Sequence, residues 1–288
     1  MDKNITQIID LTLKEDHIRE DISTSLLIPP LHKSTAYIVV KEKAVLCGLD
    51  IVRQIYKRID PTLKFKNLCH DGQRVKPQRK IAIVHGSTRS ILQGERVVLN
   101  FLIHLSGIAT LTNLYIQKIK RLKTKIFDTR KTMPGLRVLE KYAVRCGGGK
   151  NHRPHLGTML MIKDNHIAAL KPQRSLKIII ARLRQKTNKP IEVEVENYKQ
   201  FVEAYLQKPD IILLDNMKIT EIQKMVKFHR QHKFHKHIQL EASGGVTLKT
   251  VRRLAQAGVD RISIGALTHS AKAIDISLEV MPNKRRRR

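Results

Sequence analysis

The sequence has 288 residues, of which 41% are hydrophobic, so it can form a sizeable core in one large domain or two unequal ones. Only 4% of the residues are aromatic and tryptophan is absent, which excludes an aromatic-rich core. The 55 lysine and arginine residues outnumber the 25 aspartate and glutamate residues, giving a formal net charge of +30. That charge suits either nucleic acid or polyanionic substrates.

Cysteine usage and the start of the chain indicate a cytoplasmic protein. Cys47, Cys69 and Cys146 are far apart and form no CxxC motif, so neither a disulfide framework nor a cysteine zinc site is predicted. Cys146 has no evident base beside it and is interpreted as a packed small residue rather than a nucleophile. The polar N-terminus does not resemble a signal peptide, and no uninterrupted apolar run approaches the ~20 residues that span a bilayer.

The N-terminal part of the chain is predicted to be mixed α and β. Apolar spacing predicts helices over residues 4–16 and 50–59, and strands over 35–49 (strand, turn and strand), 63–75 and 80–87. Residues 90–122 have helical periodicity but contain Ser106-Gly107, so we expect two helices, or one helix broken there. We divide the chain at this point into an N-terminal domain over 1–107, onto which 272–288 can pack back, and a second domain over 108–271.

From about residue 124, short β-branched runs alternate with helical patterns. Strands are predicted over residues 124–128, 157–164, 190–196, 210–215, 238–243 and 260–266. This alternation implies parallel strands with right-handed crossovers, in either a barrel or an open doubly wound sheet. Polar or glycine residues end every one of these strands. Because α/β barrels carry their chemistry at that end, the barrel is favoured.

Glycine loops follow the last two of these strands. Ser243-Gly244-Gly245 and Gly265-Ala266 each precede a helical pattern, where backbone amides and the helix dipole attract anions. Paired loops after late barrel strands predict a phosphate site, with tight turns that bind nothing as the alternative.

Carboxylates stand on two neighbouring predicted strands. The stretch "IEVEVE" places Glu192, Glu194 and Glu196 on one face. Glu194 and Asp215 lie at strand ends, where carboxylates can hold Mg²⁺ or stabilise a developing positive charge. Pairing with nearby lysine and arginine side chains is the alternative reading.

Basic side chains gather between residues 128 and 167, in loops and at strand ends near glycines. They are Arg130, Lys131, His152, Arg153 and Lys163. Arginine binds carboxylate or phosphate in bidentate fashion and lysine acts as a point charge, so we interpret the group as an anion pocket rather than a solvated face. Arg96, judged by spacing alone, is an ordinary surface arginine.

Seven motifs follow one another along the chain: "ERVVLNFLIHLSGIATLT", "DTRKTMPGLRVLEKYAVRCGGGKNHR", "MIKDNHI", "EVEVEN", "IILLDN", "LEASGGVTL" and "DRISIGALTHSA". Together they resemble the quinolinate phosphoribosyltransferase family, also called nicotinate-nucleotide pyrophosphorylase or diphosphorylase (carboxylating), from about residue 8 to residue 280. The resemblance implies an N-terminal α/β sandwich domain and an incomplete (open) α/β barrel of the type II phosphoribosyltransferase kind. It implies a pentosyltransferase that converts quinolinate and phosphoribosyl pyrophosphate to nicotinate mononucleotide, pyrophosphate and CO₂, in de novo NAD biosynthesis.

The resemblance also assigns roles to individual residues. Those implied for quinolinate are Arg96 (from a neighbouring subunit), Arg130, His152, Arg153 and Lys163. Those implied for phosphoribosyl pyrophosphate are Lys131, Glu194, Asp215, Ser243, Gly244 and Gly265. Lys131, Glu194 and Asp215 would be catalytic, and the two acids would hold Mg²⁺, partly through water. The family further implies a homodimer or homohexamer with shared active sites.

Two other functions are weighed against this one. A related phosphoribosyltransferase acting on another base would not need His152 and Arg153, which match a second carboxylate-binding pocket. A nucleic-acid-binding protein needs aromatic platforms or a recognition helix, and six phenylalanines and six tyrosines give it little support. We therefore expect small-molecule substrates, with no specific nucleic acid and no membrane as partners, and a solvated tail at "NKRRRR".

Overall fold

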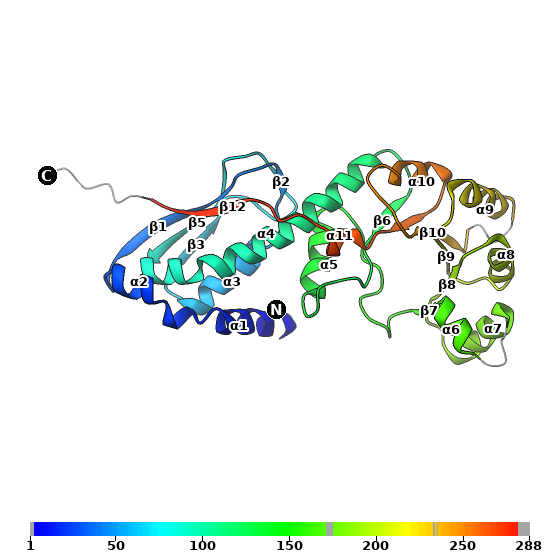
Figure 1. The fold of residues 1–288 in the computed structure, drawn as a ribbon, viewed down its shortest axis with the longest axis horizontal. Helices are drawn as coiled ribbons and strands as arrows, with labels where there is room; N and C mark the ends of the chain where they lie inside the picture. The colour runs from blue at the N-terminus through cyan, green and yellow to red at the C-terminus, as the bar shows by residue number, and fades with distance from the viewer. Residues whose placement is uncertain (1–2, 171–174, 233, 235, 282–288) are drawn as a thin grey trace. The chain divides into compact units, whose positions relative to one another are not determined.

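The computed structural model describes residues 3–170, 175–232, 234 and 236–281. The chain forms two compact units, coloured along the chain in Figure 1. Unit 1 comprises Met1–Asn113, Thr132–Gly148 and Leu267–Arg288, and unit 2 comprises Leu114–Lys131 and Gly149–Ala266. The basic "NKRRRR" tail lies outside the described residues.

Unit 1 is built on a four-stranded antiparallel sheet. β1 (Lys33–Val40) pairs with β5 (Arg79–Ser87) and with the C-terminal β12 (Ile276–Val280), and β3 (Lys64–Asn67) pairs with β5. The return of β12 to β1 is visible in Figure 1, where the red strand lies beside the blue one. The expected strand, turn and strand over 35–49 are present as β1 and β2 (Ala44–Val45), but β2 pairs with β4 (Arg74–Val75) and not with β1.

Unit 1 also contains several helices. They include α1 (Lys3–Glu15), the 3₁₀ helix η1 (Ile18–Glu20), α2 (Ile22–Leu27), α3 (Leu49–Ile59) and α5 (Arg137–Cys146). The α3 helix forms at the predicted place because Leu49, Val52, Ile55 and Tyr56 recur at helical spacing and are all buried. Its first turn is capped from outside, since the Asp71 carboxylate accepts the N–H groups of Gly48 (3.0 Å) and Leu49 (3.1 Å).

The helix α4 (Thr88–Lys118) is continuous, so the expected break at Ser106-Gly107 is wrong. Gly107 serves another purpose there: a Cβ at this position would lie 2.3 Å from the Lys272 carbonyl oxygen, so glycine lets the chain pass close by on its way to β12. By length and composition α4 could cross a membrane, with a stretch of mean hydropathy 1.6, but 61% of that stretch is buried in the fold. Burial of this kind is what the core helix of a water-soluble fold also shows.

Unit 2 contains a six-stranded parallel sheet whose strands all fall in the predicted places. They are β6 (Lys125–Phe127), β7 (Leu160–Ile162), β8 (Ile191–Val195), β9 (Ile211–Asp215), β10 (Gln239–Ser243) and β11 (Arg261–Ser263). The strand order is β6-β11-β10-β9-β8-β7, so consecutive strands from β7 to β11 are neighbours and the first strand, β6, lies beside the last, β11. In a doubly wound sheet the strand order would reverse at a switch point within the sheet. The order is that of a barrel left open between β6 and β7, which confirms the predicted fold class.

Crossover helices connect these strands. They are α6 (Asp164–Ala169), α7 (Leu176–Lys186), α8 (Tyr198–Leu206), α9 (Ile219–Gln231) and α10 (Val251–Ala257), and the short α11 (Ala266–His269) follows β11. The Asn197 side chain caps α8 by accepting the Gln200 N–H at 3.0 Å. Phe201 and Tyr205 of α8 pack edge to face against Phe228 of α9, with ring centroids 5.7 and 5.3 Å apart. The few aromatic residues thus concentrate where two crossover helices meet.

Candidate active site

The carboxyl ends of the six parallel strands lie at one edge of the unit 2 sheet. The register pairs Asp215 with Ser243, Glu194 with Leu213, and Ser263 with Phe127. Predicted site residues of unit 2 that lie on or just after these ends are Arg130, Lys131, Lys163, Glu194, Asp215, Ser243, Gly244 and Gly265. The strand topology therefore gathers residues that are scattered over more than a hundred positions of sequence.

Asp128, which follows β6, joins two of the basic motifs. It is fully buried, and its carboxylate accepts hydrogen bonds from the Asn151 side chain (2.6 Å) and the His152 N–H (2.7 Å). A parallel bridge between Phe127 and Lys150 extends the same pairing. The "DTR" and "NHR" motifs consequently run side by side.

This pairing brings two guanidinium groups close together. The Arg153 guanidinium group is held by two hydrogen bonds, which it donates to the Met159 carbonyl (3.1 Å) and to the Met161 sulfur (3.3 Å). Burial and the like charge of Arg130 both lower the pKa of Arg153. Two neighbouring guanidinium cations repel each other, and an anion placed between them removes this repulsion. The arrangement therefore favours a carboxylate ligand.

His152 lies deeper, in a buried cluster of charged groups. Its Nε2 is 3.1 Å from Glu192 Oε2 and 3.4 Å from Glu241 Oε1, and both glutamates are fully buried. Arg261 Nε lies 2.6 Å from Glu241 Oε2, and its guanidinium carbon is 3.9 Å from the Phe127 ring centroid. The cluster therefore links β8, β10 and β11 to the "NHR" segment.

The cluster holds an additional proton near neutral pH. Burial alone would lower the pKa of His152, but hydrogen bonds and charges from Glu192 and Glu241 raise it to about 9. Burial raises the pKa of Glu192, and the hydrogen bond and charge of His152 offset only part of this rise. Because His152 and Glu192 titrate together, the raised value describes the cluster rather than His152 alone.

Lys163 and two acids occupy the strand ends beside this cluster. Lys163 Nζ is 3.3 Å from Glu194 Oε2. Burial raises the pKa of Glu194, the positive charge of Lys163 lowers it, and the negative charge of Asp215 raises it again. Glu194 and Asp215 are thus near enough to repel each other while both stay partly open to solvent, a donor set that fits a divalent cation with water ligands.

The glycine loop after β10 has a shape that only glycine permits. Gly244 has φ +88°, and a Cβ there would lie 2.1 Å from Asn216 Oδ1. Asn216 also has a positive φ of 51° and donates its N–H to the Ser243 carbonyl at 3.0 Å. Gly245 has φ +55° and open space where its Cβ would be. The backbone at Gly245 is therefore open to a ligand, as an anion-binding loop requires.

One predicted site residue lies elsewhere. Arg96 is an exposed residue of α4 within unit 1, while the other candidates belong to unit 2. The sequence interpretation did not assign Asp128, Glu192 or Glu241 to the site. The alternation in "IEVEVE" places Glu192 on the same strand face as Glu194, and this pattern could have assigned Glu192 to the site. Asp128 and Glu241 stand at predicted strand ends, but nothing in the sequence linked them to His152, because their partners are distant along the chain.

Comparisons with known proteins match both parts of the chain. Family models for the N-terminal and C-terminal domains of quinolinate phosphoribosyl transferase match residues 21–106 and 108–279. A "Probable nicotinate-nucleotide pyrophosphorylase (carboxylating)" of Synechocystis is 41% identical over 273 residues, covering 94% of this chain and 90% of the relative. The corresponding protein of Mycobacterium leprae is 37% identical over 263 residues, covering 90% of this chain and 91% of the relative.

Solved structures agree with these matches. The nicotinate-nucleotide pyrophosphorylase of Francisella tularensis has a TM-score of 0.90 at 37% identity, covering 98% of this chain and 97% of that one. NadC from Streptococcus pyogenes also has a TM-score of 0.90 at 37% identity, covering 98% and 99%. The fold and its strand-end cations thus define a phosphoribosyltransferase of the open-barrel class. Within that class, the chain belongs to the quinolinate phosphoribosyl transferase family.

Proposed function

We propose that this protein transfers the phosphoribosyl group of phosphoribosyl pyrophosphate to quinolinate, releasing pyrophosphate and CO₂ and forming nicotinate mononucleotide for de novo NAD biosynthesis. Membership of the family over both domains carries this proposal. The close pair of Arg130 and Arg153 beside the acids at the strand ends supports it, because the reaction joins a dicarboxylate to a ribose carbon that becomes positive.

Quinolinate is held by the basic residues of unit 2. Arg130, Arg153 and Lys163 bind its two carboxylates, and His152 positions Arg153 through the hydrogen bond between Nδ1 and the Arg153 N–H. The Glu192 and Glu241 carboxylates fix the His152 ring in turn. Holding the pyridine nitrogen in line with the ribose carbon supplies much of the rate acceleration, since positioned reactants avoid the entropy cost of encounter.

The first chemical step breaks the bond between the ribose carbon and pyrophosphate. The bonding electrons leave with pyrophosphate, and positive charge develops on the ribose. Glu194 and Asp215 stabilise that charge, while Lys131 offsets the negative charge of the departing group. The loop Ser243–Gly245 and Gly265 bind the 5′-phosphate through backbone amides. The pyridine nitrogen then forms its bond to the ribose carbon.

The second step removes one carboxylate. With its nitrogen alkylated, the pyridinium ring accepts the electrons of the breaking carbon–carbon bond at the adjacent ring carbon. CO₂ leaves, and a proton from solvent completes nicotinate mononucleotide. The residues that gripped this carboxylate now face neutral CO₂, so the charge-assisted contacts that held the dianion are lost with the leaving group.

Mg²⁺ is part of the proposal, and Glu194 with Asp215 are the residues that would hold it. Their adjacent strand ends and partial exposure fit a hard cation that keeps several water ligands. When bound, the ion supplies charge neutralisation for the pyrophosphate oxygens. We further propose a cytoplasmic homodimer or homohexamer, in which Arg96 of a neighbouring subunit reaches quinolinate.

Release of ¹⁴CO₂ from carboxyl-labelled quinolinate tests this function directly. We expect release only with phosphoribosyl pyrophosphate and Mg²⁺ together, and nicotinate mononucleotide in equal amount. The same mixture with nicotinate in place of quinolinate is the control for a related base. Product from nicotinate, with none from quinolinate, would contradict the assignment.

A further inference from the structure

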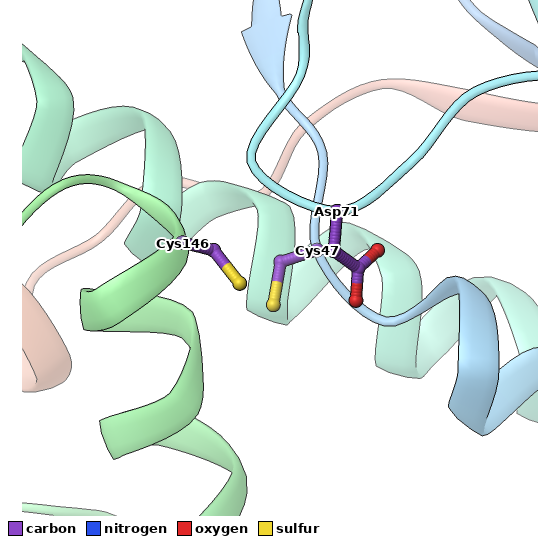
Figure 2. Close-up of side chains that lie close together, drawn as sticks. All are labelled: Cys47, Asp71 and Cys146. Atoms are coloured by element: carbon purple, nitrogen blue, oxygen red, sulfur yellow. The ribbon is translucent and has the colours of Figure 1, made fainter.

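Two cysteines that are far apart in sequence meet in unit 1. The Sγ atoms of Cys47 and Cys146 and a carboxylate oxygen of Asp71 all lie within 4.8 Å of one another. Figure 2 shows the Cys146 side chain pointing toward the Cys47 sulfur, with the Asp71 carboxylate on the other side of Cys47. Cys47 follows β2, whereas Cys146 is the last residue of α5. This thiol pair plays no part in the proposed reaction.

The backbone holds both cysteines in place through α4. Ser106 Oγ accepts the Cys47 N–H at 3.1 Å and donates to the Cys47 carbonyl at 3.3 Å. On the other side, a Cβ at Gly147 would lie 2.4 Å from the Ala109 carbonyl oxygen, so glycine lets the end of α5 approach α4 closely. The two sulfur atoms are therefore kept together by packing.

The two thiols differ in environment. Cys47 is fully buried, and burial raises its pKa well above the usual value. Cys146 is half-buried, and the hydrogen bond from Cys47 lowers its pKa, against an opposing contribution from burial. Cys146 is thus the accessible, more readily ionised thiol, with Cys47 as a protonated thiol behind it. Sensor cysteines with a resolving partner share this arrangement.

A metal site would need a third free ligand, and Asp71 is already engaged. Its Oδ1 accepts the Leu49 N–H, and its Oδ2 accepts both the Gly48 N–H and the Tyr142 hydroxyl at 2.8 Å. A cation at this carboxylate would have to displace the α3 cap or Tyr142. The geometry consequently favours bond formation between the sulfurs over coordination.

We propose that Cys47 and Cys146 form a reversible thiol–disulfide exchange site, at which small-molecule disulfides convert the pair to an intramolecular disulfide. The Cys146 thiolate attacks one sulfur of the small disulfide, forms a mixed disulfide and releases one thiolate. The Cys47 thiol then attacks the Cys146 sulfur, its proton passing to the second thiolate released. Two protein thiols are oxidised, and one small disulfide is reduced to two thiols.

Thiol trapping on the full-length protein tests this proposal. The reduced protein is incubated with oxidised glutathione, quenched in acid, alkylated, digested without reductant and analysed by mass spectrometry. We expect a peptide joining Cys47 to Cys146, alkylated Cys69, and complete reversal by dithiothreitol. Cys69 is the matched control, since it is also buried and its sulfur contacts the Arg79 side chain at 3.5 Å. C69S should form the same cross-link as the wild type.

Single variants resolve the order of the steps. In C47S, or C47A if the former is unstable, Cys146 should stop at the mixed disulfide with glutathione. In C146S, Cys47 should stay unmodified over the same time. A wild-type protein that keeps glutathione on Cys146, cross-links through Cys69 or alkylates fully would overturn the proposal. So would stoichiometric Zn²⁺ that survives desalting in the wild type and is lost in C47S and C146S.

Discussion

Lys163 Nζ lies 3.3 Å from Glu194 Oε2, so the residue proposed to bind a quinolinate carboxylate is paired with the acid proposed to face the ribose. A bound quinolinate competes with Glu194 for this ammonium group. Binding of quinolinate to Lys163 therefore changes the electrostatic surroundings of Glu194, the acid proposed to face the ribose of phosphoribosyl pyrophosphate. The pair is about half-exposed on the lysine side, so its own contribution to stability is small.

Replacing Lys163 should change both quinolinate binding and pH dependence. Loss of a charge-assisted carboxylate contact in K163M should raise the KM for quinolinate by roughly 10- to 100-fold. Because the positive charge of Lys163 lowers the pKa of Glu194, that pKa rises in K163M. Ionised Glu194 is needed, so the acid limb of the kcat profile should move to higher pH. K163R, which keeps the charge, should leave the limb in place, and an unmoved limb in K163M would contradict the coupling.

Lys131 is predicted to act in catalysis and not in folding. Its side chain is exposed after β6, so K131A should unfold at the wild-type denaturant concentration. Loss of one charge that offsets the departing pyrophosphate should lower kcat by roughly 100-fold or more. Steady-state rates measured beside urea unfolding curves separate the two effects. Near-normal turnover in K131A would remove Lys131 from the mechanism.

Mixing variants tests whether active sites are shared between subunits. R96A should be inactive by itself, although Arg96 is an exposed residue that its own unit does not need for packing. If Arg96 serves the site of a neighbouring subunit, R96A and K131A subunits dissociated and reassembled together should form some intact sites. Activity should then return to a fraction of the wild-type value. Failure of rescue in assembled mixtures would count against sharing.

The two adjacent glycines of the β10 loop should respond differently to alanine. In G244A the new Cβ meets Asn216 Oδ1 at 2.1 Å and the Asn216 nitrogen at 2.9 Å, at a φ of +88°, so the loop must move. In G245A the Cβ enters open space at φ +55°, which costs about 1 kcal/mol of backbone strain. We expect G244A to be the less stable variant, with the larger rise in KM for phosphoribosyl pyrophosphate. The reverse order would refute the loop assignment.

The buried cluster around His152 predicts a pH-dependent stability. A pKa raised to about 9, from an ordinary value of 6.5, means that the folded protein binds more protons than the unfolded chain between these values. The stabilisation is complete below pH 6.5 and falls by about 1.4 kcal/mol per pH unit as the pH rises towards 9. H152Q should flatten this slope in urea unfolding, whereas H155Q, at an exposed histidine, should retain it.

Much of the architecture was predictable because it depends on local pattern. The β-branched runs of unit 2 mark its strands, and polar residues at their ends indicated a barrel edge bearing the chemistry. The expected break in α4 was wrong because the reason for Gly107 lies in Lys272, more than a hundred residues away. A helical glycine near a distant backbone looks, in sequence, like a helix breaker.

By itself, the sequence determined the elements, the strand–helix alternation and the family, since each depends on spacing and motifs within a short stretch of chain. Tertiary structure alone decided that Glu192 and Glu241 enclose His152, that β2 pairs with β4, and that Cys47 faces Cys146. These contacts join residues whose separation in the chain leaves no periodic signal. They arise only when packing closes the long loops between them.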